Sequence, residues 1–79
     1  MKSSNKRVIL RMEEMNMWMG SKMEVTKEFN DYLTKEIVPV GTILIGNGYS
    51  GNEYATGNSF GKQISASWDD VESCMKFSH

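Results

Sequence analysis

The stretch from residue 46 to residue 61 most limits the folds that this chain can adopt. It holds five glycines and three asparagines, and Glu53 is its only charged residue. Residues of these types favour turns, and this stretch lacks the apolar spacing of a helix. A long loop inside a small domain is either functional or disordered. We therefore expect a Gly/Asn/aromatic loop over residues 46–61, set within a single domain that spans residues 1–79.

Aromatic side chains recur at nearly regular intervals within this stretch. The pattern Gly-Asn-x-aromatic occurs three times, and its aromatic residues are Tyr49, Tyr54 and Phe60. Aromatic rings on a nearly neutral loop can contact a protein partner or stack on unpaired bases. Residues 46–51 also match Gly-x-Gly-x-x-Gly. Dinucleotide binding needs a helix to begin at that motif, and the glycines that follow argue against one.

Helix and strand signals alternate in the rest of the C-terminal part. Residues 27–37 place apolar side chains at i, i+3, i+4 and i+8, which predicts an amphipathic helix. The branched run 42–45 predicts a buried strand, and the alternation over 63–68 predicts a second strand. Ser67, three residues before Asp70, predicts the N-cap of a final short helix. The expected apolar stripe of that helix consists of Val71, Cys74 and Met75.

Residues 7–25 fit two different structures. Alternating apolar residues on either side of Gly20 predict a hairpin that pairs Met19 with Met23. Residues 7–19 also have apolar side chains at helical spacing, with Gly20 as the helix C-cap. We adopt the hairpin and keep the helix as the alternative.

Together these elements predict an α+β domain, in which a small antiparallel sheet packs with two helices in a ββα-ββα-like order. The alternative fold has a helical N-terminal half, followed by a β-hairpin and a C-terminal helix. In both folds, residues 1–5 precede the first element as a flexible basic arm.

Reactive side chains are scarce in this sequence. Cys74 is the only cysteine and His79 is the only histidine. One thiol cannot form an internal disulfide, and the supply of cysteine and histidine is too small for a zinc site. Two pairs of adjacent carboxylates, Glu13-Glu14 and Asp69-Asp70, show no arrangement typical of general acid and base catalysis. We therefore expect a protein that is not an enzyme and that binds no metal and no cofactor.

Basic residues are concentrated at the N-terminus. Four of the nine lysines and arginines lie within the first eleven residues, which contain no acid. These residues would contact phosphates if the chain bound single-stranded nucleic acid, which is our alternative function. They are Lys2, Lys6, Arg7 and Arg11. No apolar run is long enough to span a membrane, so we expect no membrane association and a cytoplasmic location.

Methionines are dense next to a tryptophan in the N-terminal part. Five of the seven methionines lie between residues 12 and 23, and Met and Trp are enriched at binding surfaces. We predict that the protein-binding residues are Met15, Met17, Trp18, Met19, Tyr49, Tyr54 and Phe60. In its size and its lack of catalytic groups, the chain resembles the small proteins that bacteriophages make to disable host machinery. We therefore expect a small inhibitor or adaptor that occludes a larger partner, located in the host cytoplasm if it is viral, and a homodimer is a further expectation.

Overall fold

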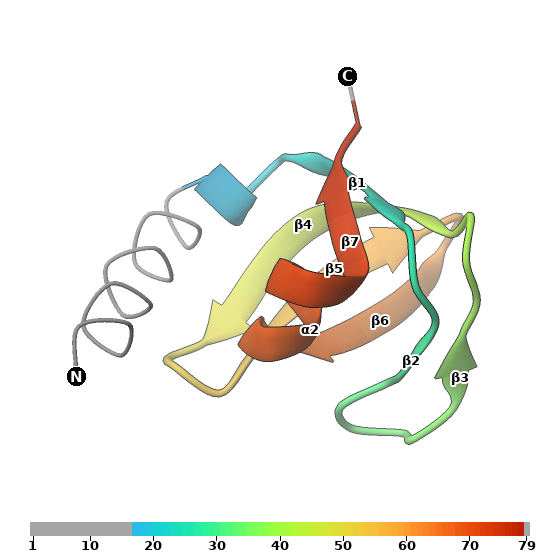
Figure 1. Cartoon of the computed structure of the whole chain (residues 1–79). Coiled ribbons are helices and arrows are strands. Elements are labelled where there is room, and N and C mark those ends of the chain that lie inside the picture. The colour runs from blue at the N-terminus through green and yellow to red at the C-terminus, as the bar shows by residue number, and fades with distance from the viewer. Residues whose placement is uncertain (1–16, 79) are drawn as a thin grey trace, which may run out of the picture.

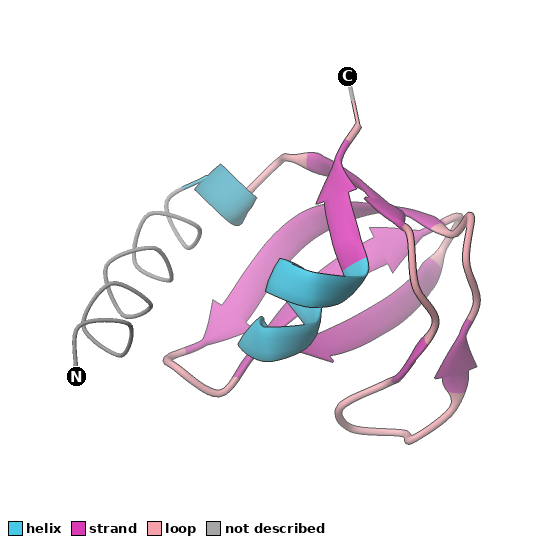
Figure 2. Ribbon diagram, viewed as in Figure 1, coloured by secondary structure: helices cyan, strands magenta, loops and turns pink. Residues whose placement is uncertain are grey.

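The computed structural model describes residues 17–78, and strands dominate it (Figures 1 and 2). Met17 and Trp18 are helical and lead through a turn into the first strand. The elements that follow are β1 (Lys22–Val25), β2 (Phe29–Asn30), β3 (Ile37–Val38), β4 (Ile43–Ser50), β5 (Tyr54–Ser59), β6 (Lys62–Ser67), α2 (Trp68–Cys74) and β7 (Met75–Phe77). Of these elements, α2 is the only helix.

Five strands form one antiparallel sheet in the order β6-β5-β4-β1-β7. The strands β2 and β3 form a separate two-stranded sheet in the segment that joins β1 to β4. Strands from the two ends of the described chain therefore lie side by side, since Met23 of β1 pairs with Phe77 of β7 (Figure 1).

The long strand β4 belongs to both halves of the main sheet. Its first residues, Ile43 to Ile45, pair with β1, and its later residues pair with β5. The register with β5 shifts between Gly46 and Gly48. A bulge of this kind bends a strand and lets it pass from one half of a folded sheet to the other. The two halves thereby enclose one core.

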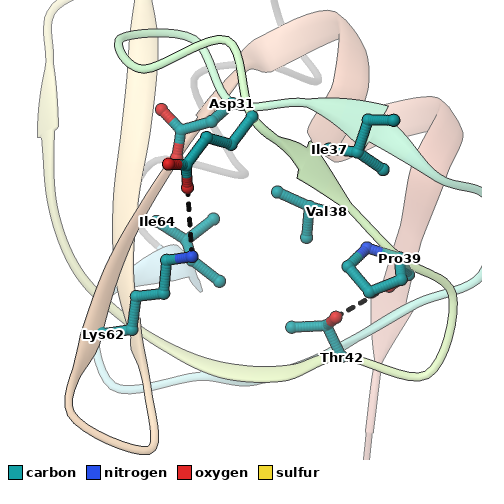
Figure 3. A pocket seen from close by; sticks show the side chains of 8 residues that line it. Asp31, Ile37, Val38, Pro39, Thr42, Lys62 and Ile64 are labelled. Atoms are coloured by element: carbon teal, nitrogen blue, oxygen red, sulfur yellow. Dashed lines mark hydrogen bonds and ion pairs between the residues drawn. The ribbon is translucent and has the colours of Figure 1, made fainter.

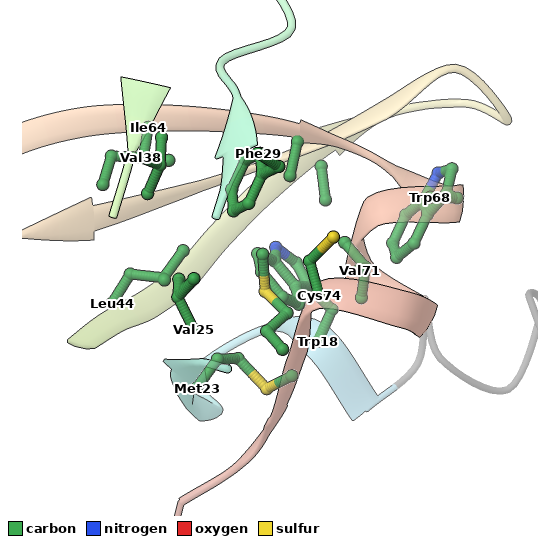
Figure 4. Close-up of a cluster of buried hydrophobic side chains, with 13 residues drawn as sticks. Trp18, Met23, Val25, Phe29, Val38, Leu44, Ile64, Trp68, Val71 and Cys74 are labelled. Carbon is green, nitrogen blue, oxygen red and sulfur yellow. The ribbon is translucent and has the colours of Figure 1, made fainter. Parts of the chain in front are cut away.

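Two tryptophans are the largest fully buried side chains of this core (Figure 4). The rings of Trp18 and Trp68 meet edge to face, with centroids 6.1 Å apart. Trp18 Nε1 donates to Thr56 O at 2.8 Å and Trp68 Nε1 donates to Gly51 O at 3.0 Å, as buried indoles require. The other core residues are Met23, Val25, Phe29, Val38, Leu44, Ala55, Ile64, Ala66, Val71, Cys74 and Met75.

The predicted fold with two helices is wrong, because residues 27–37 form the β2–β3 hairpin instead of a helix. Asp31 explains the difference. Its Oδ1 accepts hydrogen bonds from the backbone N–H groups of Leu33 (2.9 Å) and Thr34 (3.0 Å). An aspartate that binds the backbone two and three residues later stabilises a turn in competition with a helix. Lys35 then adopts a φ of 69°, which no α-helix contains.

The predicted N-terminal hairpin also differs from the structure. Met23 pairs with Leu44 of β4 and with Phe77 of β7, and not with Met19. Most of the first arm of that hairpin, residues 7–16, lies outside the described residues, as does the predicted basic arm, residues 1–5.

Residues 46–61 form the second part of β4, all of β5 and two tight turns rather than a loop. Their glycines permit close packing. A Cβ on Gly57 would stand 2.6 Å from Leu44 Cδ1, and a Cβ on Gly46 would overlap the backbone oxygen of Trp18. Strand glycines of this kind mark places where another chain segment approaches closely.

The predicted final helix is confirmed as α2, with Val71 and Cys74 of the predicted stripe buried. Trp68, predicted as the end of the preceding strand, is instead the first residue of α2, and Met75 of the predicted stripe lies in β7. Ser67 is its N-cap, and its Oγ accepts from Asp70 N at 3.1 Å. We expect Ser67→Ala to lower the free energy of unfolding by about 1 kcal/mol, because this N–H loses its partner. Urea unfolding measures the change. Ser73→Ala, on the exposed side of the same helix, should cost less than Ser67→Ala, and equal losses would contradict a capping role.

A buried carboxylate fastens the β2–β3 hairpin to the edge strand β6. Asp31 is only 4% exposed, and its Oδ2 accepts from Ser65 N at 2.9 Å. Tyr32 N donates to Ser65 O at 3.1 Å, so both backbone groups of Ser65 are paired. Burial acts to raise the pKa of Asp31, but hydrogen bonds from Ser65, Thr34 and Leu33 outweigh burial and lower it. The hairpin thus covers part of a sheet edge.

Candidate docking groove

An apolar groove of about 380 Å³ lies on the outer face of the main sheet. Ile45 is at its centre, because β4 places Ile45 directly between Lys22 of β1 and Asn58 of β5. Alternation along β4 sends Leu44 into the core and leaves Ile45 42% exposed. We call this site the Phe60 groove. Its lining residues are Lys22, Ile43, Ile45, Asn58 and Phe60.

Phe60 is the most unusual residue of the groove. It lies in the turn between β5 and β6 and is 94% exposed. Its φ is 52° and that of the following Gly61 is 88°, so two successive residues are left-handed. Gly61 N donates to Asn58 Oδ1 at 3.0 Å, which helps to close the turn. Asparagine and glycine are the residues that such a turn favours, whereas a bulky side chain is a rare outlier there.

The groove offers hydrogen-bond donors together with its apolar surface. Lys22 is the only charged residue in its lining. The side-chain oxygen of Asn58 already accepts from Gly61, so the Asn58 NH₂ group is the part that can serve a ligand. On the same face, Glu24 lies directly across from Lys76 in the register of β1 and β7. The groove is therefore suited to bind a hydrogen-bond acceptor such as a carboxylate.

A second, smaller hollow of about 50 Å³ separates the β2–β3 hairpin from β6 (Figure 3). Val38 and Ile64 line it, and Lys62 closes it by pairing with Glu36 at 3.1 Å between Nζ and Oε1. Both partners of this ion pair are largely exposed, so the pair contributes little to stability. The hollow is a packing gap beneath the hairpin, too small for more than one or two water molecules.

The structure separates the three aromatic residues that the sequence analysis grouped. Phe60 lines the groove, whereas Tyr54 begins β5 at the opposite end of that strand. The Tyr54 ring stacks on Tyr32, with centroids 4.7 Å apart. Tyr49 is half exposed and leans against Trp68, with ring centroids 6.0 Å apart. Among these three, Phe60 alone projects freely from the surface.

The predicted methionine and tryptophan surface is divided as well. Met17 and Met19 are exposed, but Trp18 between them is buried in the core. Met15 and the four basic residues Lys2, Lys6, Arg7 and Arg11 lie outside the described residues. The sequence pattern did not indicate that Lys22, Ile43, Ile45 and Asn58 line a common groove. The alternation of Ile43, Leu44 and Ile45 was the available signal, since it gives a strand one inner face and one outer face.

Across residues 17–78, no group of three His, Cys, Asp or Glu side chains is arranged to hold a metal ion. Cys74 is buried, with its Sγ 3.8 Å from Asp70 Oδ1. None of the helices in this part of the molecule has the length and apolar character needed to cross a membrane.

Comparison with known proteins identified no relative: no family model, no curated protein and no solved structure matches this chain.

Proposed function

We propose that this protein is a non-enzymatic protein-binding domain that engages its partner through the Phe60 groove. The exposed, left-handed Phe60 carries the proposal. A side chain in this position adds strain and gains almost no burial among residues 17–78, so the packing of these residues gives no reason for a phenylalanine. Strained residues of this kind cluster at binding sites.

The groove has the composition of a binding hot spot. Ile43 and Ile45 provide an apolar floor beside the Phe60 ring, and Lys22 and Asn58 form a polar rim. Aromatic anchors surrounded by polar residues carry most of the binding energy in protein interfaces. Burying the Phe60 side chain in a complex would contribute roughly 1.5–3 kcal/mol. Binding of this kind makes the protein an inhibitor or an adaptor, which acts by occupying a surface of its partner.

The variant Phe60→Asn tests this function because it separates binding from folding. Asparagine tolerates a left-handed φ better than phenylalanine does, so we expect the free energy of unfolding to rise by about 0.5–1 kcal/mol. Peptides selected from a displayed random library on the immobilised wild-type protein should bind the variant roughly 10- to 100-fold more weakly, because the aromatic anchor is gone. Urea unfolding and fluorescence titration measure the two changes.

A matched control removes a comparably exposed apolar side chain elsewhere. Leu33 lies in the turn between β2 and β3 and is 57% exposed, so Leu33→Ser should leave peptide affinity unchanged. The proposal fails if the library gives no peptide that depends on Phe60, or if Leu33→Ser weakens binding as much as Phe60→Asn does.

Binding of single-stranded nucleic acid remains a prediction about residues 2–11. Residues 17–78 contain five lysines and no arginine against eight acidic residues. A surface with this balance gives phosphates no general attraction. Tyr54 is already stacked on Tyr32, so its ring has one face occupied. The described part of the chain therefore favours the protein-binding function.

A further inference from the structure

We infer that the occupant of the Phe60 groove is a short extended segment of a partner protein, carrying large apolar side chains and an aspartate or glutamate. This inference rests on the proposed function and adds the chemistry of the partner. It follows from the size of the groove, the groups on its rim and the spacing of the strands beneath it.

The size of the groove favours a short segment over a second copy of the chain. The groove, which five residues line, can be filled by a few side chains of a short segment, whereas a stable interface with a second folded copy would engage about 20–30 residues on each side, most of them outside the groove. A symmetric dimer formed through this groove would also bring two copies of Lys22 close together. A peptide segment needs only a few side-chain contacts and meets no such repulsion.

The hydrogen-bond donors on the rim of the groove indicate which polar group the segment should carry. Lys22 contributes an ammonium group and Asn58 contributes amide N–H donors, and no acidic residue is part of the lining. These two donors are complementary to an anionic acceptor. The acid nearest to them on this face is Glu24, which lies across from Ile43 on one side and from Lys76 on the other. A basic residue in the segment would instead meet Lys22 and be repelled.

The strands set the spacing between the two kinds of side chain. Lys22, Ile45 and Asn58 stand in one row across β1, β4 and β5, and neighbouring strands are about 4.8 Å apart. The donors therefore flank the apolar floor at about that distance on either side. An extended segment presents residues i and i+2 on one face, about 7 Å apart. An apolar residue over Ile45 thus places an acidic residue two positions away within reach of Lys22.

Synthetic peptides test this pattern directly. Three nine-residue peptides have threonine spacers and contain Leu and Phe two positions apart, with Asp, Asn or Lys two positions before the Leu. Binding to the full-length protein is measured by amide chemical-shift titration. We expect the Asp peptide to bind about fivefold more tightly than the Lys peptide, with a larger ratio at low salt. The shifts should centre on Lys22, Ile45 and Phe60.

Charge reversal supplies the decisive comparison. Lys22→Glu should invert the order, so that the Lys peptide binds more tightly than the Asp peptide. Lys27→Glu, an exposed lysine between β1 and β2, should preserve the wild-type order. Phe60→Asn should weaken all three peptides.

The remaining outcomes distinguish this inference from the proposed function. Binding that depends on Phe60 but is equal for all three peptides overturns the acidic segment and retains the binding function. A dimer that forms with rising concentration and is abolished by Phe60→Asn makes a second copy the occupant, and also overturns the inference. Failure of every peptide to bind, together with a monomer at all concentrations, overturns both.

Discussion

Gly46→Ala is expected to destabilise this protein by about 3 kcal/mol or more. The added Cβ would overlap the backbone oxygen of Trp18 and stand 2.8 Å from two atoms of its indole ring. Neither neighbour can move freely. Gly46 N donates to Ser21 O at 2.9 Å, and Gly20 N donates to Gly46 O at 2.8 Å, so backbone hydrogen bonds hold the segment around Trp18 against β4. Thermal unfolding should show a midpoint lowered by more than about 12 °C.

Ser50, at the end of the same strand, supplies the control for this substitution. Ser50 is exposed near the end of β4, and Ser50→Ala should change the free energy of unfolding by less than about 0.5 kcal/mol. If Gly46→Ala unfolds within 2 °C of the wild-type protein, Trp18 does not pack on β4 as described.

Asp31→Ala is expected to lower the free energy of unfolding by about 2–4 kcal/mol. The carboxylate accepts hydrogen bonds from Leu33 N, Thr34 N and Ser65 N. Its loss leaves these donors without their partner, in a site where Ser65 is buried, and hydrogen bonds to a charged group are the stronger kind. Urea unfolding measures the loss. Glu36→Gln, which removes only the exposed ion pair with Lys62, should cost less than about 1 kcal/mol.

The same carboxylate makes stability depend on pH in the acid range. Its pKa is lowered in the folded state from an ordinary value of 3.8. The contribution of the charged form to stability is therefore complete above about pH 5 and is lost as the pH falls through the lowered pKa. The free energy of unfolding should fall less over that window in Asp31→Asn than in the wild-type protein. Parallel pH profiles for the two proteins would rule out a stabilising charge on Asp31.

The sequence predicted those elements whose local signals agree with their tertiary setting. The cap at Ser67 gave the start of α2, and the alternation over residues 63–68 gave most of β6. The apolar run at 42–45 gave the first part of β4. In each of these segments the hydrophobic pattern and the boundary residues point to the same structure.

The other elements depend on contacts between distant residues. Phe29 and Tyr32 fit a helical pattern, but Phe29 enters the core from a two-residue strand and Tyr32 stacks on Tyr54. The glycines at 46 and 57 resemble loop residues until Trp18 and Leu44 are seen to pack on them. The spacing of residues along the chain does not indicate these tertiary neighbours. The sequence pattern alone therefore favoured a helix for residues 27–37 and a loop for residues 46–61.

The groove was predictable only in part for the same reason. Phe60 was a candidate because it is aromatic and follows Gly-Asn-Ser. Asn58 is close to Phe60 in sequence, but Lys22 joins them only through the pairing of β1 with β4 and of β4 with β5. No local property of a lysine 38 residues before Phe60 in sequence indicates that partnership.

The pairing of β1 with β7 also sets an order of events during folding. The strands β4, β5 and β6 are joined by turns of a few residues, so their ladders form at little cost in loop entropy. Met23 and Phe77 must instead meet across more than fifty residues, and such long-range closure is the slow kind of step. We therefore expect the meander of three strands to assemble early and the junction between β1 and β7 to form last.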